Sequence, residues 1–207
     1  MFELIKELKS KLINFLKGDL FKSISIYTIL GFANKAFPFV LLPFLTRVLT
    51  PADYGIMAMF ATVRAFFSPF IGLGAPSSIE RYYFDKDEIN FSQYLSNIIL
   101  IILATAVFFG SILLLLRENI SNISGVPKSY LWIIIVVSSG TIINKINLII
   151  YRVKMQSKSF AYLNFFETAF YFILMILFVF GFKLDWRADI YSQFLIYILL
   201  GVWGIYT

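Results

Sequence analysis

Two cations lie inside long apolar stretches in the N-terminal part of this chain. Lys35 follows Asn34 within the apolar stretch Ile24–Thr46, and Arg64 lies in the middle of the next one, Tyr54–Ile79. At about 1.5 Å per helical residue, Lys35 is roughly 17 Å and Arg64 roughly 15 Å from the start of its stretch. Both depths fall near the middle of a hydrocarbon layer about 30 Å thick, where an unpaired cation costs on the order of 3 kcal/mol. We therefore expect both cations to face a water-filled cavity or a partner within the protein.

Cations at this depth have two interpretations. The guanidinium of Arg64 can offer a two-pronged fork to phosphate oxygens, and the ammonium of Lys35 offers a compact charge. On the first interpretation Arg64, Lys35 and the neighbouring Asn34 bind an anionic substrate such as a phosphate or diphosphate. On the second they pair with carboxylates of other helices or line a polar seam. The sequence leaves both open.

A second polar group lies further along the chain and contains Lys145 and Glu167. If these residues are on consecutive antiparallel helices, they lie about 8 Å and 10 Å from the same membrane face. Opposite charges at matching depth predict an internal ion pair, with Asn144 and Asn147 lining the same polar pocket. A structural ion pair is one interpretation. A proton or cation coupling site at Glu167 is the other.

The chain has no cysteine and no histidine. Disulfides, thiolate chemistry, histidine metal ligands and histidine proton relays are therefore excluded together. The only Gly-x-Gly, Gly72-Leu-Gly74, lies in an apolar segment, where it does not indicate a nucleotide site. We expect no catalytic residue, no metal site and no cofactor, so the chain is not predicted to be an enzyme.

Long apolar segments position these residues. Of the 207 residues 59% are hydrophobic and 14% charged, and the mean hydropathy is +0.81; soluble domains are about one quarter charged. Strands of a membrane barrel alternate apolar and polar residues over about ten positions, whereas segments such as Tyr94–Leu116 are apolar throughout. The predicted fold is an all-α, polytopic transmembrane helical bundle of about six spans. They are Ile24–Thr46, Tyr54–Ile79, Tyr94–Leu116, Tyr130–Tyr151, Phe160–Phe182 and Ile190–Thr207.

Helix-disturbing residues concentrate in the first two spans. They are Pro38, Pro43, Pro69 and Pro76, with Gly31, Gly72 and Gly74. Broken helices are tolerated in membranes where their freed carbonyls line a cavity, and they supply hinges for alternating access. We therefore expect spans one and two to be broken, either for transport or as static kinks for packing.

Basic residues set the expected topology. With the N-terminus inside, ten Lys and Arg fall in inner segments and five in outer loops, which favours a cytoplasmic N-terminus. The net charge of +6 is therefore attributed to topology, and no nucleic-acid partner is expected. Residues 1–22 are predicted to form an amphipathic helix on the cytoplasmic surface, or else a frayed basic leader. Residues 23–207 form the transmembrane lobe. Its last span ends at Thr207 without a charged flank, which favours truncation at the C-terminal end.

Two sequence blocks carry a family resemblance. They are LLPFLTRVLTPADYGIMAMF at Leu41–Phe60 and SPFIGLGAPSSIERYYFD at Ser68–Asp85. Both resemble the bacterial polysaccharide-biosynthesis flippases of the Wzx type. These are the O-antigen and capsule repeat-unit translocases of the multidrug/oligosaccharidyl-lipid/polysaccharide exporter superfamily. The resemblance implies a two-lobed fold of twelve or more helices, of which this chain would be the N-terminal lobe.

The resemblance also implies a function. The expected activity is alternating-access export of undecaprenyl-diphosphate-linked oligosaccharide across the bacterial inner membrane, for lipopolysaccharide or other surface polysaccharide. The expected partners are this lipid-linked oligosaccharide, membrane lipids and the polysaccharide polymerase machinery. Alternatives are a peptidoglycan-precursor flippase, a cation-coupled drug exporter, or a non-transporting scaffold of a glycan-synthesis complex.

Overall fold

The computed structural model describes residues 19–83 and 90–206, apart from the side chains of residues 19–24, 26, 27, 35, 205 and 206. This part of the chain is helical and contains no strand, so the all-α prediction is confirmed. Most of the predicted amphipathic segment, and the side chain of Lys35, lie outside the described residues. The helices are α2 (Asp19–Leu45), α3 (Pro51–Gly72), α4 (Ala75–Tyr82), α5 (Phe91–Leu115), α6 (Arg117–Ser124), α7 (Leu131–Val153), α8 (Ser157–Ile176) and α9 (Arg187–Tyr206).

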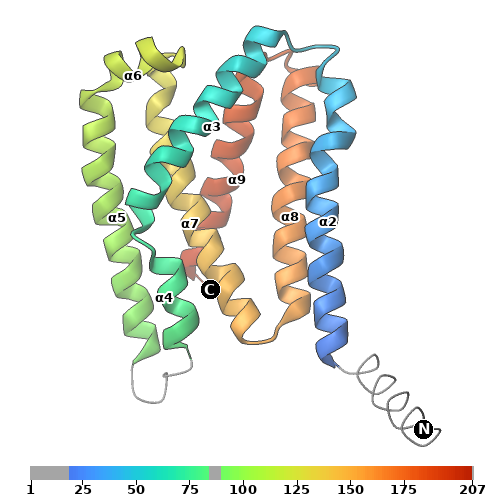
Figure 1. The fold of residues 1–207 in the computed structure, drawn as a ribbon, viewed down its shortest axis with the longest axis vertical. Coiled ribbons are helices and arrows are strands. Elements are labelled where there is room, and N and C mark those ends of the chain that lie inside the picture. Colours follow the sequence, from blue (N-terminus) through green and yellow to red (C-terminus); the bar gives the residue numbers. More distant parts are fainter. Residues whose placement is uncertain (1–18, 84–89, 207) are drawn as a thin grey trace, which may run out of the picture.

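Five of the described helices are long and apolar enough to cross a membrane: Thr28–Leu45, Pro51–Gly72, Phe91–Leu115, Lys128–Val153 and Ser157–Gly181. The predicted sixth span corresponds to α9, which runs alongside them (Figure 1) but is not among the five. α9 carries Asp189, Ser192 and Gln193 in its first two turns. α9 packs against both α7 and α8, and Asp189 accepts from the Tyr171 hydroxyl of α8, whereas Ser192 and Gln193 bond within α9. The molecule is a multi-pass membrane protein.

The predicted second span, Tyr54–Ile79, is two helices. α3 ends at Gly72, and the next two residues adopt left-handed conformations, Leu73 with φ of 44° and Gly74 with φ of 73°. The Leu73 amide donates to the carbonyl of Pro69 at 2.9 Å and so caps α3. A new helix, α4, then begins at Ala75. A left-handed pair cannot continue a right-handed helix, and glycine takes that conformation at no steric cost.

The predicted break in the first span is wrong. α2 is one helix from Asp19 to Leu45, with Pro38 and Pro43 inside it. Each proline removes one backbone hydrogen bond and disturbs the helix locally, and the turns on either side of it continue. An irregular helical turn does occur in a later span, but that turn contains no proline. Leu177–Gly181 after α8 is π-helical, and the Phe182 amide donates to the carbonyl of Leu177, five residues back, at 3.2 Å.

α7 is the central helix of the bundle. It contacts α3, α4, α5, α8 and α9, whereas α2 packs mainly on α8. Figure 1 shows α2 and α8 side by side at one edge and α5 at the other, with α7 and α9 between them and α3 running diagonally across the middle toward α4 and α5. We call the end of the bundle at which α2 begins the lower end, and the end with the α2–α3 turn the upper end, as drawn there.

Small residues let α7 and α9 approach closely. A Cβ atom added at Gly140 would lie 2.4 Å from the Tyr197 carbonyl oxygen, and one added at Gly204 would lie 2.3 Å from the Asn147 side-chain nitrogen. Close backbone approach through small residues is how helices pack without a hydrophobic driving force in lipid. The remaining apolar core joins α3, α4, α5 and α7, with Phe60, Ile71 and Ile134 fully buried.

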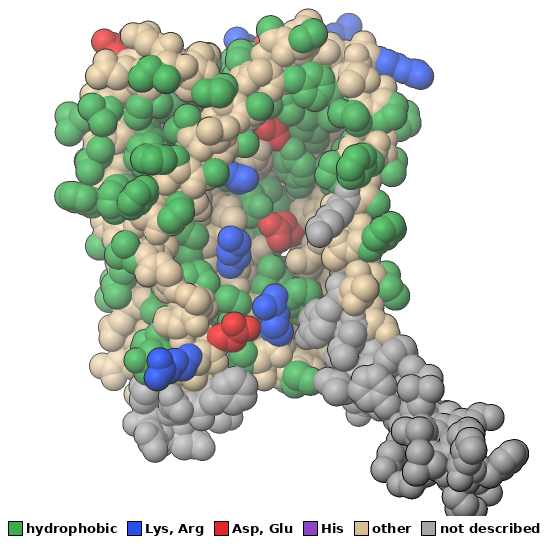
Figure 2. Space-filling model, viewed as in Figure 1, with side chains coloured by type: hydrophobic (Ala, Val, Ile, Leu, Met, Phe, Trp, Pro, Cys, Tyr) green, Lys and Arg blue, Asp and Glu red, His purple; other side chains and the backbone are tan. Residues whose placement is uncertain are grey.

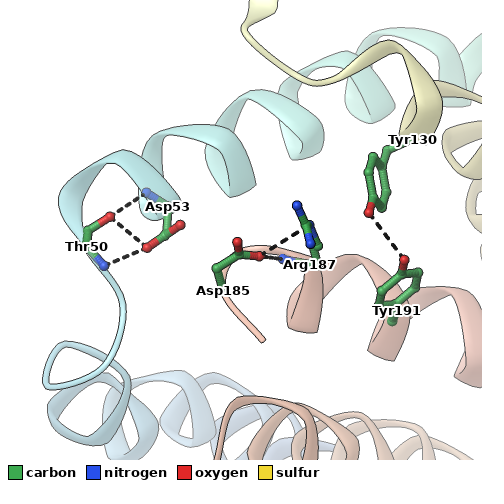
Figure 3. A network of polar contacts seen from close by, with 6 residues as sticks. All are labelled: Thr50, Asp53, Tyr130, Asp185, Arg187 and Tyr191. Carbon is green, nitrogen blue, oxygen red and sulfur yellow. Dashed lines mark hydrogen bonds and ion pairs between the residues drawn. The ribbon is translucent and has the colours of Figure 1, made fainter. Parts of the chain in front are cut away.

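Polar contacts fix the upper end (Figure 3). The Thr50 hydroxyl accepts from the Asp53 amide at 3.3 Å, and the Asp53 carboxylate accepts from the Thr50 amide at 2.8 Å, which is a reciprocal helix cap. Pro51 occupies the first helical position, where its missing N–H costs nothing. The Thr-Pro-Ala-Asp sequence therefore turns the chain out of α2 and starts α3.

Candidate functional site

A polar pocket of about 250 Å³ lies where four helices face one another. Figure 2 shows Lys, Arg, Asp and Glu side chains in a file down the middle of one face, between the apolar side chains of the flanking helices. The lining comes from α2, α3, α8 and α9: Asn34, Arg64, Glu167, Thr168, Tyr171, Phe172, Gln193, Ile196 and Tyr197. Three of the residues predicted from sequence, Asn34, Arg64 and Glu167, are thus brought together.

Arg64 provides the positive charge of this pocket. It is half-buried and lies thirteen residues after the start of α3 and eight before its end, or roughly 20 Å and 12 Å along the helix axis. Its charge acts on the carboxylates of Glu167 and Asp189 and on the hydroxyls of Tyr171 and Tyr197. Among the described residues it nevertheless forms no ion pair with either carboxylate. Its N–H donors are therefore open to a ligand.

The Glu167 carboxylate is held by two neutral donors. Its Oε2 accepts from Asn144 Nδ2, and its Oε1 from the Tyr197 hydroxyl, each at 2.8 Å. These bonds tie α8 to α7 and to α9. The predicted ion pair with Lys145 is wrong, because Lys145 is exposed and forms no ion pair with Glu167 in the described part of the chain. Consecutive helical residues point about 100° apart, so turning Asn144 inward, where it is 2% exposed, turns Lys145 outward.

The other residues predicted for these sites are Asn34, Asn147 and Lys35, which lie on α2 and α7. The side-chain amide of Asn34 on α2 donates to the side-chain oxygen of Asn164 on α8, while the oxygen of Asn34 is buried without a partner. Asn147 is half-buried and packs against Gly204 of α9, away from the pocket lining. Lys35 lies in α2, with its side chain outside the described residues.

A second carboxylate was not predicted from the sequence. Asp189 on α9 is 5% exposed; it accepts from the Tyr171 hydroxyl at 2.5 Å and from Gln193 Nε2 at 2.9 Å. Two features of the sequence could have indicated it. Asp189 directly precedes the apolar stretch Ile190–Thr207, and Gln193 follows four residues later on the same helix face. Asp189 thus has its own donors and, like Glu167, leaves Arg64 unpaired.

A further polar pocket of about 360 Å³ lies beside the first, toward the lower end. Leu30, Gly31, Asn34, Arg152, Phe160 and Asn164 line it, so Asn34 borders both pockets. Arg152, in the last turn of α7, pairs with Glu80 of α4 at 3.6 Å and lies 5.6 Å from the ring centre of Phe160. Arg152 lies one residue beyond the predicted span Tyr130–Tyr151, and α7 extends to include it. The two polar pockets adjoin at Asn34, between α2 and α8.

The geometry suits an anionic ligand. A guanidinium without a carboxylate partner can form two parallel bonds to phosphate oxygens, and both nearby carboxylates are already satisfied by neutral groups. Within the described residues, no three carboxylates gather at metal-binding spacing. Fold and site together define a multi-pass helical membrane protein with a polar, cation-bearing pocket inside its bundle.

Comparison with known proteins identifies the family. Residues 20–206 match the model of the polysaccharide biosynthesis protein family, and the chain belongs to that family. A relative from Haemophilus influenzae, described as an uncharacterized membrane protein, is 36% identical over 66 residues. Those residues are 32% of this chain and 16% of the relative, so this chain is about half as long as that protein. No solved structure matches significantly.

Proposed function

We propose that this chain is part of a flippase that carries undecaprenyl-diphosphate-linked oligosaccharide repeat units across the bacterial inner membrane. The chain's membership of the polysaccharide biosynthesis family supports a role in making surface polysaccharide. The hydrophilic head of such a lipid cannot cross hydrocarbon unaided, so a polar path through the membrane is required. The protein acts by alternating access and performs no covalent chemistry. Its N-terminus and lower end face the cytoplasm.

One observation carries this proposal, the unpaired Arg64 at mid-depth. A cation facing the bundle interior of a membrane protein is costly to keep there and is by default a candidate for a substrate or ion path. Glu167 and Asp189 are each held by neutral donors, and neither forms an ion pair with Arg64 in the described part of the chain. The substrate diphosphate supplies the missing partner. Asn34 offers a buried acceptor oxygen without a partner beside the same pocket, which suits a sugar hydroxyl of the substrate head and not its diphosphate.

The test follows the side of the membrane on which the lipid-linked oligosaccharide accumulates. A strain lacking the gene is complemented with the full-length wild-type protein, Arg64→Ala or Arg64→Lys at matched membrane abundance. Removing one member of a desolvated charge contact costs about 2 kcal/mol or more, so we expect transfer to slow roughly 30-fold or more in Arg64→Ala. Arg64→Lys keeps the positive charge but loses the two-pronged guanidinium, so its rate of transfer should lie between those of the wild type and Arg64→Ala. Arg117→Ala, an exposed arginine at the upper end, is the matched control and should transport normally.

Two results would contradict the proposal. If Arg64→Ala restores transfer fully, the pocket does not bind the diphosphate and Arg64 only packs. If the sidedness of the lipid is the same with and without the gene, the protein is not the flippase. A non-transporting scaffold of the glycan-synthesis complex then becomes the better explanation.

A further inference from the structure

The contact between α2 and α8 separates two pockets of opposite character. On one side lies the polar pocket that contains Arg64. On the other side lies an apolar groove of about 540 Å³ whose lining includes five phenylalanines: Phe37, Phe44, Phe165, Phe172 and Phe180. We call this the α2–α8 groove. Phe172 lines both the groove and the polar pocket. Phe172 thus borders both the charged interior and the apolar outer surface.

The wall between the two pockets is made of ring contacts. Phe37 of α2 stacks on Phe172 of α8, with ring centres 5.3 Å apart, and its centre is 6.4 Å from that of Phe165. The Asn34–Asn164 amide contact joins the same two helices. Phe37 and Phe172 are both half-buried, so this part of the α2–α8 contact can open with less loss of buried apolar surface than the Leu41, Leu45 and Met175 cluster next to it.

α2 is the helix best suited to move. It packs mainly on α8, and its Phe32 and Phe39 are 77% and 76% exposed. Pro38 and Pro43 each lack an N–H, so the carbonyls of Asn34 and Phe39, four residues earlier, have no helical donor. The helix is therefore least stiff over the residues that form the wall.

We propose that the α2–α8 groove holds the polyprenyl chain of the anionic lipid whose head occupies the polar pocket. This rests on the proposed function and names where the lipid tail lies. Separation of α2 from α8 at Phe37 and Phe172 opens a lateral passage, so the head enters while the tail stays in apolar surroundings. The adjoining groove and pocket match the two halves of one amphiphile, an apolar chain and an anionic head. A protein helix docked in the groove would leave the charge of Arg64 without a partner.

The first experiment captures the lipid. A photo-crosslinking amino acid replaces Phe44, which lines the groove, or Phe39, an exposed phenylalanine of the same helix that does not. In cells making the full-length protein, we expect Phe44 to capture polyprenyl-linked lipid several-fold more than Phe39, and Arg64→Ala to reduce that capture. Equal capture at both positions, capture of ordinary phospholipid or protein instead, or capture unchanged by Arg64→Ala would overturn the proposal.

The second experiment locks the passage. This chain has no natural cysteine. In a full-length protein freed of any cysteine elsewhere, a Phe37→Cys, Phe172→Cys pair can be joined by a short bis-methanethiosulfonate linker, which spans the gap left by the two rings and is cleaved by reductants. We expect the cross-link to stop transfer and a reductant to restore it. The control is Trp132→Cys with Phe194→Cys, an equally close ring pair between α7 and α9 at 5.4 Å, whose cross-link should leave transfer intact. Continued transfer with α2 linked to α8 would overturn the lateral passage.

The two proposals fail in different ways. If transfer depends on Arg64 but continues through the linked α2–α8 protein, the passage is wrong and the flippase stands. If the gene has no effect on the sidedness of the lipid, the flippase is wrong. Photo-capture at Phe44 then reports separately on what occupies the groove.

Discussion

The hydrogen bonds to Glu167 give the sharpest test of how the bundle is held together. Tyr197→Phe removes the hydroxyl that donates to Oε1 at 2.8 Å and keeps the ring. Asn144→Leu removes the donor to Oε2 at similar volume, and it also removes a buried amide oxygen that has no partner. Both bonds join α8 to other helices, so their loss should lower the free energy of unfolding.

The expected size follows from the partners. Hydrogen bonds to charged groups are worth about 1.5–3 kcal/mol in soluble proteins, whereas interhelical bonds in membranes average about 0.6 kcal/mol. Since Glu167 is desolvated by its surroundings, we expect Tyr197→Phe to cost about 1–2 kcal/mol. Asn144→Leu should cost less, because the unpartnered oxygen disappears with the donor. The double variant should lose roughly 1 kcal/mol more than the sum, since the carboxylate then keeps neither donor.

Natural fluorophores make the measurement direct. The chain has three tryptophans, Trp132, Trp186 and Trp203, whose emission can follow unfolding by sodium dodecyl sulfate in mixed micelles. Tyr162→Phe is the control, because Tyr162 is 76% exposed, and it should unfold like the wild type. If Tyr197→Phe matches the control, or if the double variant is strictly additive, Glu167 is not held as described.

Two further predictions use the same assay. Gly140→Ala should cost about 1–3 kcal/mol, because the new Cβ would lie 2.4 Å from the Tyr197 carbonyl oxygen; Gly31→Ala, with nothing within 4 Å, should be neutral. Equal stability of the two variants would show that α7 and α9 are not in close contact. Thr50→Ala should cost about 1 kcal/mol by removing the cap that accepts from the Asp53 amide, while Thr50→Ser should retain most of it. A neutral Thr50→Ala would contradict the capping role.

The span pattern could be predicted from sequence to a large extent, because lipid imposes it. A helix crossing hydrocarbon must satisfy its backbone internally and needs about 20 apolar residues, so five of the six predicted stretches correspond to apolar helices of spanning length. The positions at which the helices are interrupted were less predictable from the sequence. The left-handed pair Leu73–Gly74 ends α3, whereas Pro38 and Pro43 leave α2 continuous and the π-helical turn Leu177–Gly181 contains no proline.

The candidate site could be predicted only in part. Depth along the chain identified Arg64 and Glu167 as interior charges, and both line the polar pocket. The sequence predicted Lys145 as the partner of Glu167, whereas the structure shows its neighbour Asn144 in that place. Depth along a helix does not say which way a side chain points. Asp189 was missed because it precedes the predicted last span by one residue.

The sequence by itself determined the class of this protein and the depth of its charges. Composition and apolar run length are properties of single segments, and the membrane acts on each segment separately. Only the tertiary structure decided which charges meet. The rotation of each helix about its axis depends on packing with its neighbours, such as the close approach of α7 and α9 at Gly140. That packing turns Asn144 and Tyr197 toward Glu167, so among the described residues Glu167 is held by these neutral donors and not by Arg64.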